Sequence, residues 1–357
     1  MPSFRTGKVV AILQERAGLQ RVDVDLGSGP ERAYVLTQLT GDVVVGDRVV
    51  VNTTAVELGL GTGGWHVVHW NLERDGWSQR GPGHIIKARY TSLQTDVGSA
   101  EEHAVELVEV DDIHAMPVVA APLHSQVPAV AAGFKAIAPE ARLAYVMTDG
   151  AALPLALSDL VAAMRDEHLV DRTITSGHAF GGDYEAVSTF SALAVARHLA
   201  HADAAVVAMG PGIVGTGTRL GFSGIEVGPI LDAASALGGR PIACLRVSFA
   251  DARPRHQGVS HHTLTTLRLA CRDRVTVAVP AVGGDAQARV EQDLASAGID
   301  ARHDVVAVEP PPGVLDRLGP GGLDVVSMGR PVAADPVMFE CAAAAGALAA
   351  RWVRDLP

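Results

Sequence analysis

The sequence predicts an α/β protein in which a small N-terminal β domain precedes a larger domain of alternating strands and helices. Two observations lead to this fold class. Short β-type runs separated by turn residues extend from Gly7 to Trp70, whereas strand and helix patterns alternate from His114 onward. We therefore expect residues 1–112 to form the β domain with its bridging strands, and residues 113–357 to form the α/β domain.

The N-terminal segment has the pattern of a small barrel or curled sheet. Its β-type runs are residues 8–13, 20–26, 32–36, 49–52 and 66–70. Glycine-containing turns separate these runs, and several short strands at such spacing are typical of small closed sheets. Two further strands, residues 84–91 and 104–110, are expected to form a bridge to the next domain.

Eight β/α units are expected from His114 onward. Their strands begin near Pro117, Arg142, Arg172, Asp203, Arg240, Arg274, Arg302 and Leu323. Helical patterns cover residues 127–137, 155–167, 183–199, 224–237, 261–270, 285–297, 314–318 and 336–352. Such a series fits either a closed eightfold barrel or an open, doubly wound sheet.

A short internal repetition favours the open sheet over the closed barrel. Asp203–Gly210 is echoed by Asp324–Gly329, and each closes a run of four β/α units. The domain could therefore consist of two pseudo-repeat lobes, residues 116–238 and 240–353.

Charge and composition exclude several classes of partner. The 357 residues carry a net charge of -11, and no basic run occurs among them. Nucleic acid and anionic membranes both require a concentrated basic surface, so neither is expected as a partner. The three cysteines lie among apolar neighbours, no signal peptide is recognisable, and charges interrupt the most apolar tract, residues 333–353. We expect a cytoplasmic protein, and a homo-oligomer remains open.

A glycine-rich stretch after the fourth predicted strand of this domain is the central ligand-binding candidate. An apolar run that begins at Asp203 ends in four glycines and two threonines. Bare backbone amides followed by a helix N-terminus favour an anion. The residues expected to hold the anionic part of a small molecule are Gly210, Gly212, Gly215, Thr216, Gly217 and Thr218. No acidic residue closes a following strand at the spacing that a dinucleotide site requires, so no dinucleotide cofactor is expected.

Polar side chains gather directly after the predicted strands. In either fold, the carboxyl ends of the strands lie at one edge, where ligands bind. The catalytic candidates expected to meet there are His124, Asp149, His178, Asp183, His256 and His262. The first four are also residue types that a divalent metal accepts, but their spacing matches no established metal motif. The alternative is structural: each histidine could bond a loop carbonyl, and Asp183 could cap the helix that follows it.

The loop after the fifth strand of this domain forms a second candidate cluster. The further ligand-binding candidates in this loop are Arg246, Arg253, Arg255 and His261, and Ser125 is a candidate beside His124, after the first strand of the domain. The guanidinium groups offer forks for a carboxylate or phosphate, and the adjacent histidines could donate protons to the same group. The alternative is an exposed basic loop before a helix that Ser260 caps.

With these segments in view, the chain resembles a domain-of-unknown-function family, the one numbered 3866, found chiefly in actinobacteria. The stretches that carry the resemblance are Leu123–Gln126, Tyr145–Pro154, Ser176–Asp183, Met209–Thr218, Gly221–Glu226 and Gly258–Thr263. The resemblance covers nearly the full length, and it implies family membership without implying a reaction.

These features together predict an enzyme that acts on a small anionic molecule at the carboxyl edge of the sheet. Hydrolysis or group transfer is the expected chemistry, with His178 and either His124 or His262 moving protons, and a divalent metal could assist. The alternative is a metabolite-binding regulatory module that uses the same pocket without catalysis.

Overall fold

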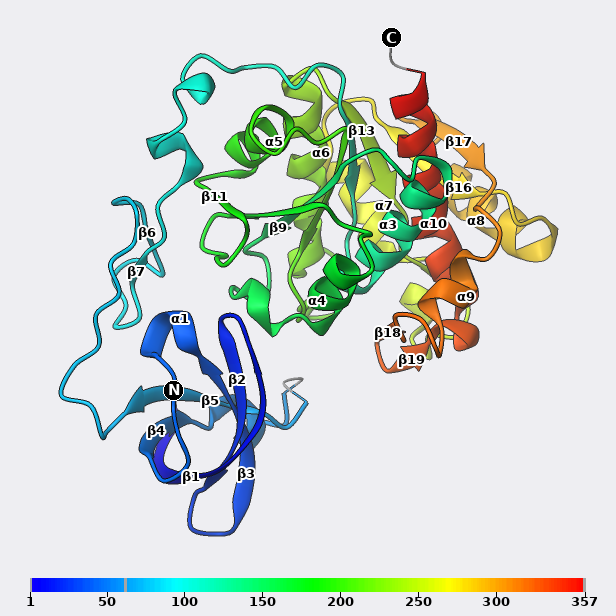
Figure 1. Ribbon diagram of the computed structural model, residues 1–357. Helices are drawn as coiled ribbons and strands as arrows, with labels where there is room; N and C mark the ends of the chain where they lie inside the picture. Colours follow the sequence, from blue (N-terminus) through cyan, green and yellow to red (C-terminus); the bar gives the residue numbers. More distant parts are fainter. Residues whose placement is uncertain (1, 61–62, 356–357) are drawn as a thin grey trace. The chain divides into compact units, whose positions relative to one another are not determined.

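The computed structural model describes residues 2–60 and 63–355. The chain divides into two compact units, Met1–Gly98 and Ser99–Pro357, and each has its own hydrophobic core (Figure 1). Residues 99–112, which the sequence pattern groups with the β domain, belong to the second unit. In this segment, Glu101 accepts a hydrogen bond of 2.9 Å from the backbone amide of Val187.

The first unit contains a closed five-stranded barrel, which confirms the predicted barrel. Its strands are β1 (Phe4–Arg16), β2 (Leu19–Asp25), β3 (Pro30–Leu36), β4 (Arg48–Asn52) and β5 (His66–Asn71), with α1 (Thr37–Thr40) and α2 (Thr54–Glu57) after β3 and β4. They close in the order β1-β2-β3-β5-β4, with β3 parallel to β5, which is the topology of the OB fold. Alternate valines of β2, Val22 and Val24, point into the core and are fully buried.

The two strands predicted as a bridge are largely absent from the described residues. Within residues 84–91 only β6 (Ile86–Lys87) forms, and it pairs with β7 (Thr95–Asp96). Residues 104–110 contain the 3₁₀ turn η2 (Val105–Leu107), which follows η1 (Ala100–Glu102). A capping box formed by Ser99 and Glu102 begins these turns, so local side-chain bonding replaces strand pairing.

The second unit contains one open, eight-stranded parallel sheet. In spatial order, its strands are β11 (Tyr184–Ala186), β10 (Arg172–Ser176), β9 (Leu143–Thr148), β12 (Ala204–Met209), β8 (Pro117–Ala120), β13 (Arg240–Cys244), β16 (Thr276–Pro280) and β17 (Asp304–Val308). Every pairing is parallel. This architecture confirms the open doubly wound sheet, and its strands form a single sheet.

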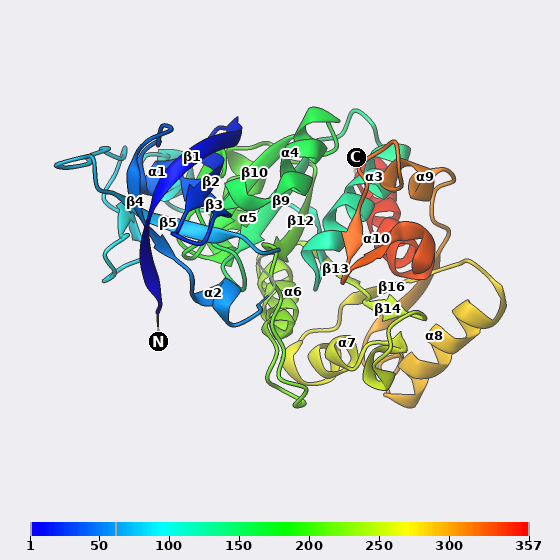
Figure 2. The same ribbon diagram turned by 90° about the horizontal axis from the view of Figure 1, so that it is seen from below.

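Helices cover both faces of the sheet (Figures 1 and 2). One face carries α3 (Val127–Ile137), α4 (Asp159–Asp166), α9 (Val314–Leu318) and α10 (Pro336–Arg354). The other carries α5 (Thr189–His198), α6 (Val227–Ala236), α7 (His261–Thr265) with the π-helical turn η7 (Thr266–Ala270), and α8 (Gly284–Ser296). Because both faces are covered, the central strands are hydrophobic without alternation, as in Ala204–Met209, which is buried throughout.

Two elements differ from the sequence prediction. The strand predicted near Leu323 is β18 (Val326–Ser327), which pairs with β19 (Arg330–Pro331) in a small ribbon outside the sheet. The eighth strand is instead β11, which lies inside the segment predicted as helix 183–199. The helix there, α5, begins only after Ser188, whose side chain accepts a hydrogen bond from the backbone amide of Ser191.

Helices α3 and α10 pack at unusually close range on one face of the sheet. A Cβ atom at Gly346 would lie 1.9 Å from the carbonyl oxygen of Val130, and one at Gly133 would lie 2.2 Å from that of Ala343. Glycine therefore permits a helix approach that no other residue allows. Among the described residues, no helix, α10 included, has the length and apolarity needed to cross a bilayer.

Candidate functional site

The carboxyl ends of the sheet strands define the edge at which most of the predicted site residues lie, whereas Asp183 lies near the amino end of β10. β8 continues into α3 on one face, whereas its neighbours β12 and β13 continue toward α6 and α7 on the other. Neighbouring strands whose connections leave on opposite faces open a crevice, and α/β proteins bind ligands at such points. The loops after β8, β12 and β13 therefore border the crevices of this sheet.

His124, in the turn η3 (His124–Gln126) after β8, is held inside the core. Its Nδ1 lies 3.0 Å from the hydroxyl of Tyr145, and its Nε2 lies 2.7 Å from Oγ of Ser158, the N-cap of α4. Burial lowers its pKa to about 4, so the ring is neutral at pH 7. Both ring nitrogens therefore have hydroxyl groups as partners inside the core.

Asp183 and Ser125 also have partners within the second unit. Asp183 forms an ion pair of 2.8 Å with Arg165 and accepts a hydrogen bond of 2.8 Å from the backbone amide of Thr173. It thereby fixes the edge of the sheet between β10 and β11 and caps no helix. The hydroxyl of Ser125 lies 2.7 Å from that of Ser327, in the ribbon strand β18.

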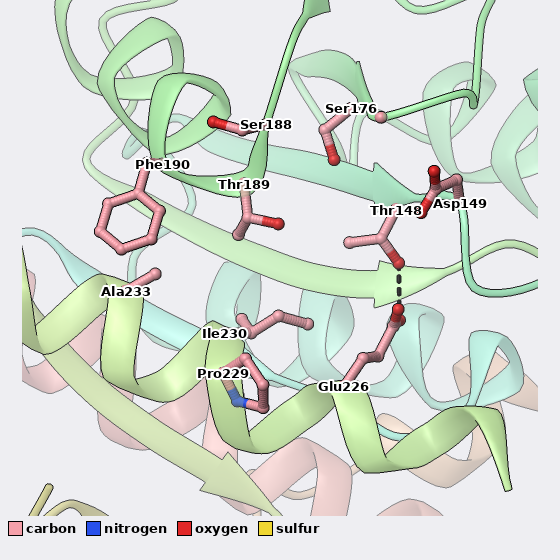
Figure 3. A pocket seen from close by; sticks show the side chains of 11 residues that line it. Thr148, Asp149, Ser176, Ser188, Thr189, Phe190, Glu226, Pro229, Ile230 and Ala233 are labelled. Atoms are coloured by element: carbon pink, nitrogen blue, oxygen red, sulfur yellow. Dashed lines mark hydrogen bonds between the residues drawn. The ribbon is translucent and has the colours of Figure 1, made fainter. Parts of the chain in front are cut away.

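Asp149 lines a cavity of about 290 Å³ on the α5–α6 face of the sheet (Figure 3). Oδ2 of Asp149 accepts a hydrogen bond of 2.9 Å from the backbone amide of His178. We call this cavity the Glu226 pocket. Its lining residues are Thr148, Asp149, Ser176, Gly177, Ser188, Thr189, Phe190, Glu226, Pro229, Ile230 and Ala233.

Glu226 is the titratable group most strongly perturbed in this pocket, and sequence analysis did not select it. The hydroxyl of Thr148 donates a hydrogen bond of 2.6 Å to Oε1 of Glu226 (Figure 3). Burial, with a smaller contribution from the negative charge of Asp149, raises the pKa of Glu226 to about 7, although the hydrogen bond from Thr148 acts to lower it. A carboxyl with this pKa exchanges protons readily at neutral pH.

The glycine-rich stretch folds into an exposed hairpin. The amide of Thr216 donates to the carbonyl of Gly221 at 2.8 Å, and the amide of Val214 donates to Oγ of Ser223 at 3.2 Å. Gly212 and Gly217 have φ angles of 103° and 80°, which L-residues rarely adopt. The glycines therefore serve the turns of the hairpin, and several of its amides donate hydrogen bonds within it. The predicted anion site on Gly210–Thr218 stays a prediction.

Three histidines converge where this hairpin meets the loop after β13. His256 lies in the turn η6 (Pro254–His256), and His261 and His262 begin α7. One ring nitrogen of each lies within 4.8 Å of the others. Phe222 of the hairpin stacks on His262, with ring centroids 3.9 Å apart and planes 2° from parallel. His256 and His262 are buried, and His261 is partly exposed.

All three imidazoles are neutral at pH 7. Burial, followed by the charge of Arg246, lowers the pKa of His256 to about 3. Burial and the neighbouring His261 lower the pKa of His262 to about 3, and burial followed by Arg255 lowers that of His261. A neutral imidazole carries a lone pair that can accept a proton or bind a metal ion.

Arginines surround the three histidines. Arg246 is buried, and its Nη1 lies 3.4 Å from Nδ1 of His262. Burial lowers the pKa of Arg246 to about 10, so it remains charged at pH 7. Arg255 is exposed, and its guanidinium carbon lies 3.8 Å from the position of a Cβ at Gly217.

The remaining charges form a partly buried network beside Arg246. Both oxygens of Asp251 accept hydrogen bonds from Arg253, which hold the pKa of Asp251 well below its usual range. Arg330 lies 3.6 Å from Asp251 and 3.3 Å from Asp335. With Arg246 and Arg255, four positive groups face two negative ones, so this region is basic in a chain of net charge -11.

The structure therefore sorts the predicted residues into three places. His256, His261, His262, Arg246 and Arg255 form one cluster, which we call the His–Arg site. Asp149 lines the Glu226 pocket and accepts a hydrogen bond from the backbone amide of His178, whereas His124, Ser125 and Asp183 serve internal contacts. The predicted metal set of His124, Asp149, His178 and Asp183 does not assemble within the part of the chain that is described.

Residues 32–346 match the model of the family described as Protein of unknown function (DUF3866). The chain belongs to this family. The matched region includes the His–Arg site and the Glu226 pocket, so both are features of the DUF3866 portion of the chain. A search of curated proteins found no match.

Proposed function

We propose that the protein is an enzyme that hydrolyses, or transfers a group from, a small anionic molecule at the His–Arg site. The observation that supports this function best is the convergence of three neutral histidines with a buried arginine at the carboxyl edge of an open parallel sheet. Ligands of α/β proteins bind at this edge. The His–Arg site combines positively charged arginines with histidines that can accept a proton or bind a metal ion.

The anionic substrate follows from the local charge. Arg246 is only 4% exposed, and the nearest carboxylate, on Asp251, lies 3.9 Å away and is shared with Arg253. A buried guanidinium with incomplete compensation favours a negatively charged partner. Arg255 at the exposed rim could contact the same anion, because it lies beside the tip of the hairpin.

The chemistry requires one electrophilic atom and one attacking water. In hydrolysis, the water oxygen bonds to the electrophilic atom, one water proton is taken up by a base, and the leaving group departs with its electron pair and receives a proton. The lone pair of a neutral imidazole can take the water proton directly or can hold a metal that binds the water.

A thermal-melt screen against anionic metabolites, performed in chelator, tests the anion site. A ligand present at about a hundred times its dissociation constant adds about 2.7 kcal/mol, which raises the melting temperature by several degrees. We expect Arg246→Gln to abolish this shift and Arg255→Gln to reduce it. His201→Asn is the matched control, because His201 is exposed and precedes β12 at the opposite edge of the sheet.

The bound compound is then incubated with the protein and its products are analysed. Turnover that is lost in His262→Asn but retained in His201→Asn supports the enzyme. A shift that survives Arg246→Gln would place the anion elsewhere and overturn the proposal. Tight binding without turnover would replace it with a metabolite-binding module.

A further inference from the structure

We propose that His256, His261 and His262 bind one divalent metal ion of the zinc class, with a fourth position open to water. Three protein ligands with one open position are typical of catalytic zinc sites. A water molecule bound to such a metal is a potent attacking group, so the metal site would supply the nucleophile for the proposed hydrolysis. The catalytic role of the metal therefore rests on the proposed function. Binding of the ion itself depends only on the three histidines.

The arrangement of the three rings is close to that of a metal site. Their centroids lie 4.3 Å apart for His261 and His262, 4.9 Å for His256 and His262, and 5.0 Å for His256 and His261. Zinc–nitrogen bonds of about 2.0–2.1 Å in a tetrahedron bring ligand nitrogens to roughly 3.3 Å. The observed nitrogens are within 4.8 Å, so small side-chain rotations suffice. No second group of this kind occurs in residues 2–60 or 63–355.

His261 provides an independent indication of a missing partner. Its Nε2 is shielded from solvent and has no hydrogen-bond partner among the described residues. A buried polar nitrogen without a partner is unfavourable, and native structures leave few of them. A metal ion at the centre of the three rings would satisfy this nitrogen.

The other two histidines have contacts that orient their rings. Nδ1 of His256 lies 2.7 Å from Oγ of Ser260. When Nδ1 donates to this hydroxyl, the lone pair resides on Nε2, which is the usual outer-shell arrangement of a metal-bound histidine. Phe222 fixes the plane of the His262 ring by stacking on it.

The positive charge of Arg246 opposes the binding of a metal cation, so a substitution at this residue should change metal binding and anion binding in opposite directions. Its guanidinium lies 3.4 Å from His262 and disfavours a second positive charge nearby. Removing the charge should tighten metal binding while it weakens anion binding. Asp251 would keep its two hydrogen bonds from Arg253, so the loop retains its main ion pair.

The decisive experiment titrates the chelator-treated, full-length protein with Co²⁺ and Zn²⁺ and with no anion present. We expect one ion per chain, a visible absorption band of four-coordinate cobalt, and displacement of cobalt by zinc. His261→Asn should weaken binding at least about 100-fold, because loss of a ligand exceeds the effect of losing an outer-shell partner. Arg246→Gln should tighten binding at least about tenfold, and His201→Asn should leave it unchanged.

His261→Asn is the most informative variant. In the wild-type protein, Nε2 of His261 has no hydrogen-bond partner among the described residues, so the substitution breaks no bond of this nitrogen and the metal-free variant should keep the wild-type melting temperature. Cobalt binding with wild-type affinity in this variant, or six-coordinate cobalt spectra in the wild type, would overturn the metal site. The anion screen in chelator is a separate experiment. If the protein binds an anion but no cobalt, the metal site is refuted and the proposed function remains intact. If it binds cobalt but no anion, only the anionic substrate is refuted.

Discussion

Glu226 concentrates the pH sensitivity of the Glu226 pocket in one carboxyl group. Its pKa is raised from 4.5 to about 7, chiefly by burial, so the native state holds the proton more tightly than the unfolded chain does. The stability that this preference contributes is complete below pH 4.5 and is lost as the pH rises through about 7. Above that range, the folded protein carries the cost of a buried charge.

Glu226→Gln should therefore stabilise the protein at high pH and leave its stability unchanged near pH 4. The amide removes the ionisation while its oxygen can still accept the hydrogen bond from Thr148. The expected gain at pH 8 is about 2 to 3 kcal/mol. Urea-unfolding free energies measured from pH 4 to pH 8 for wild type and variant test this difference. Glu140→Gln, at an exposed position, is the control.

The cause of the shift can be checked through Asp149. Asp149→Asn keeps an oxygen for the amide of His178 but removes the negative charge that raises the pKa of Glu226. The pH range over which stability declines should move to lower values. If the pH range of the stability loss is unchanged in Asp149→Asn, the pKa shift of Glu226 is due to burial alone. If Glu226→Gln raises the unfolding free energy equally at pH 4 and pH 8, the pH dependence does not come from the titration of Glu226.

Residue types and their spacing identified the His–Arg site, but not the Glu226 pocket. A loop dense in histidine and arginine after a buried strand indicates function because such side chains are rarely needed for packing. Glu226 lay in a predicted helix, residues 224–237, where a carboxylate has no special meaning. Its contact with Thr148 spans 78 positions and exists only through tertiary packing.

At the scale of single elements, the contact between α3 and α10 is the most sterically demanding in the second unit. Gly346→Ala adds a Cβ that would lie 1.9 Å from a backbone oxygen of α3, so the helices must separate. Alanine favours a helix by about 1 kcal/mol over glycine, but overpacking commonly costs 1–3 kcal/mol or more. Because the clash involves a backbone atom that cannot rotate away, we expect a net loss of about 2 kcal/mol.

Denaturant unfolding of Gly346→Ala measures this loss. Gly76→Ala is the control, since no atom lies within 4 Å of the added Cβ and its φ is not left-handed. A stability within about 0.5 kcal/mol of wild type for Gly346→Ala would show that the helices move apart freely.

Helical periodicity predicted most helices closely, whereas short strands were predicted less well. The pattern over residues 127–137 matches α3 (Val127–Ile137) residue for residue. The pattern over residues 183–199 predicts only a helix and misses the three-residue strand β11, because alternation cannot be recognised over so short a length. Its pairing depends on β10, and Asp183 fixes the adjoining turn through Thr173.

At the scale of the whole molecule, the chain contains two separate cores. The barrel buries Val22, Val35 and Val49 around its own axis, and the sheet buries its two faces under helices of the second unit. The sequence predicted the β domain and the open sheet because strand and helix periods differ. It did not predict the spatial order of the strands, which depends on crossover packing.

A fragment of residues 99–357 should fold without the barrel. Both the His–Arg site and the Glu226 pocket lie entirely within this unit. We expect the fragment to show a cooperative thermal transition and to bind cobalt with the affinity of the full-length protein. Calorimetry and cobalt titration of the fragment test both expectations. A fragment that melts without cooperativity would show that the second unit needs the first.

The strand order also has a consequence for synthesis on the ribosome. β8 is the first strand of the sheet to be translated, yet its neighbours β12 and β13 lie at residues 204–209 and 240–244. The face of α3 that contacts α10 stays uncovered until residues 336–354 have been translated. The nascent chain thus exposes an alanine- and valine-rich surface throughout most of its synthesis, and such surfaces are bound by chaperones.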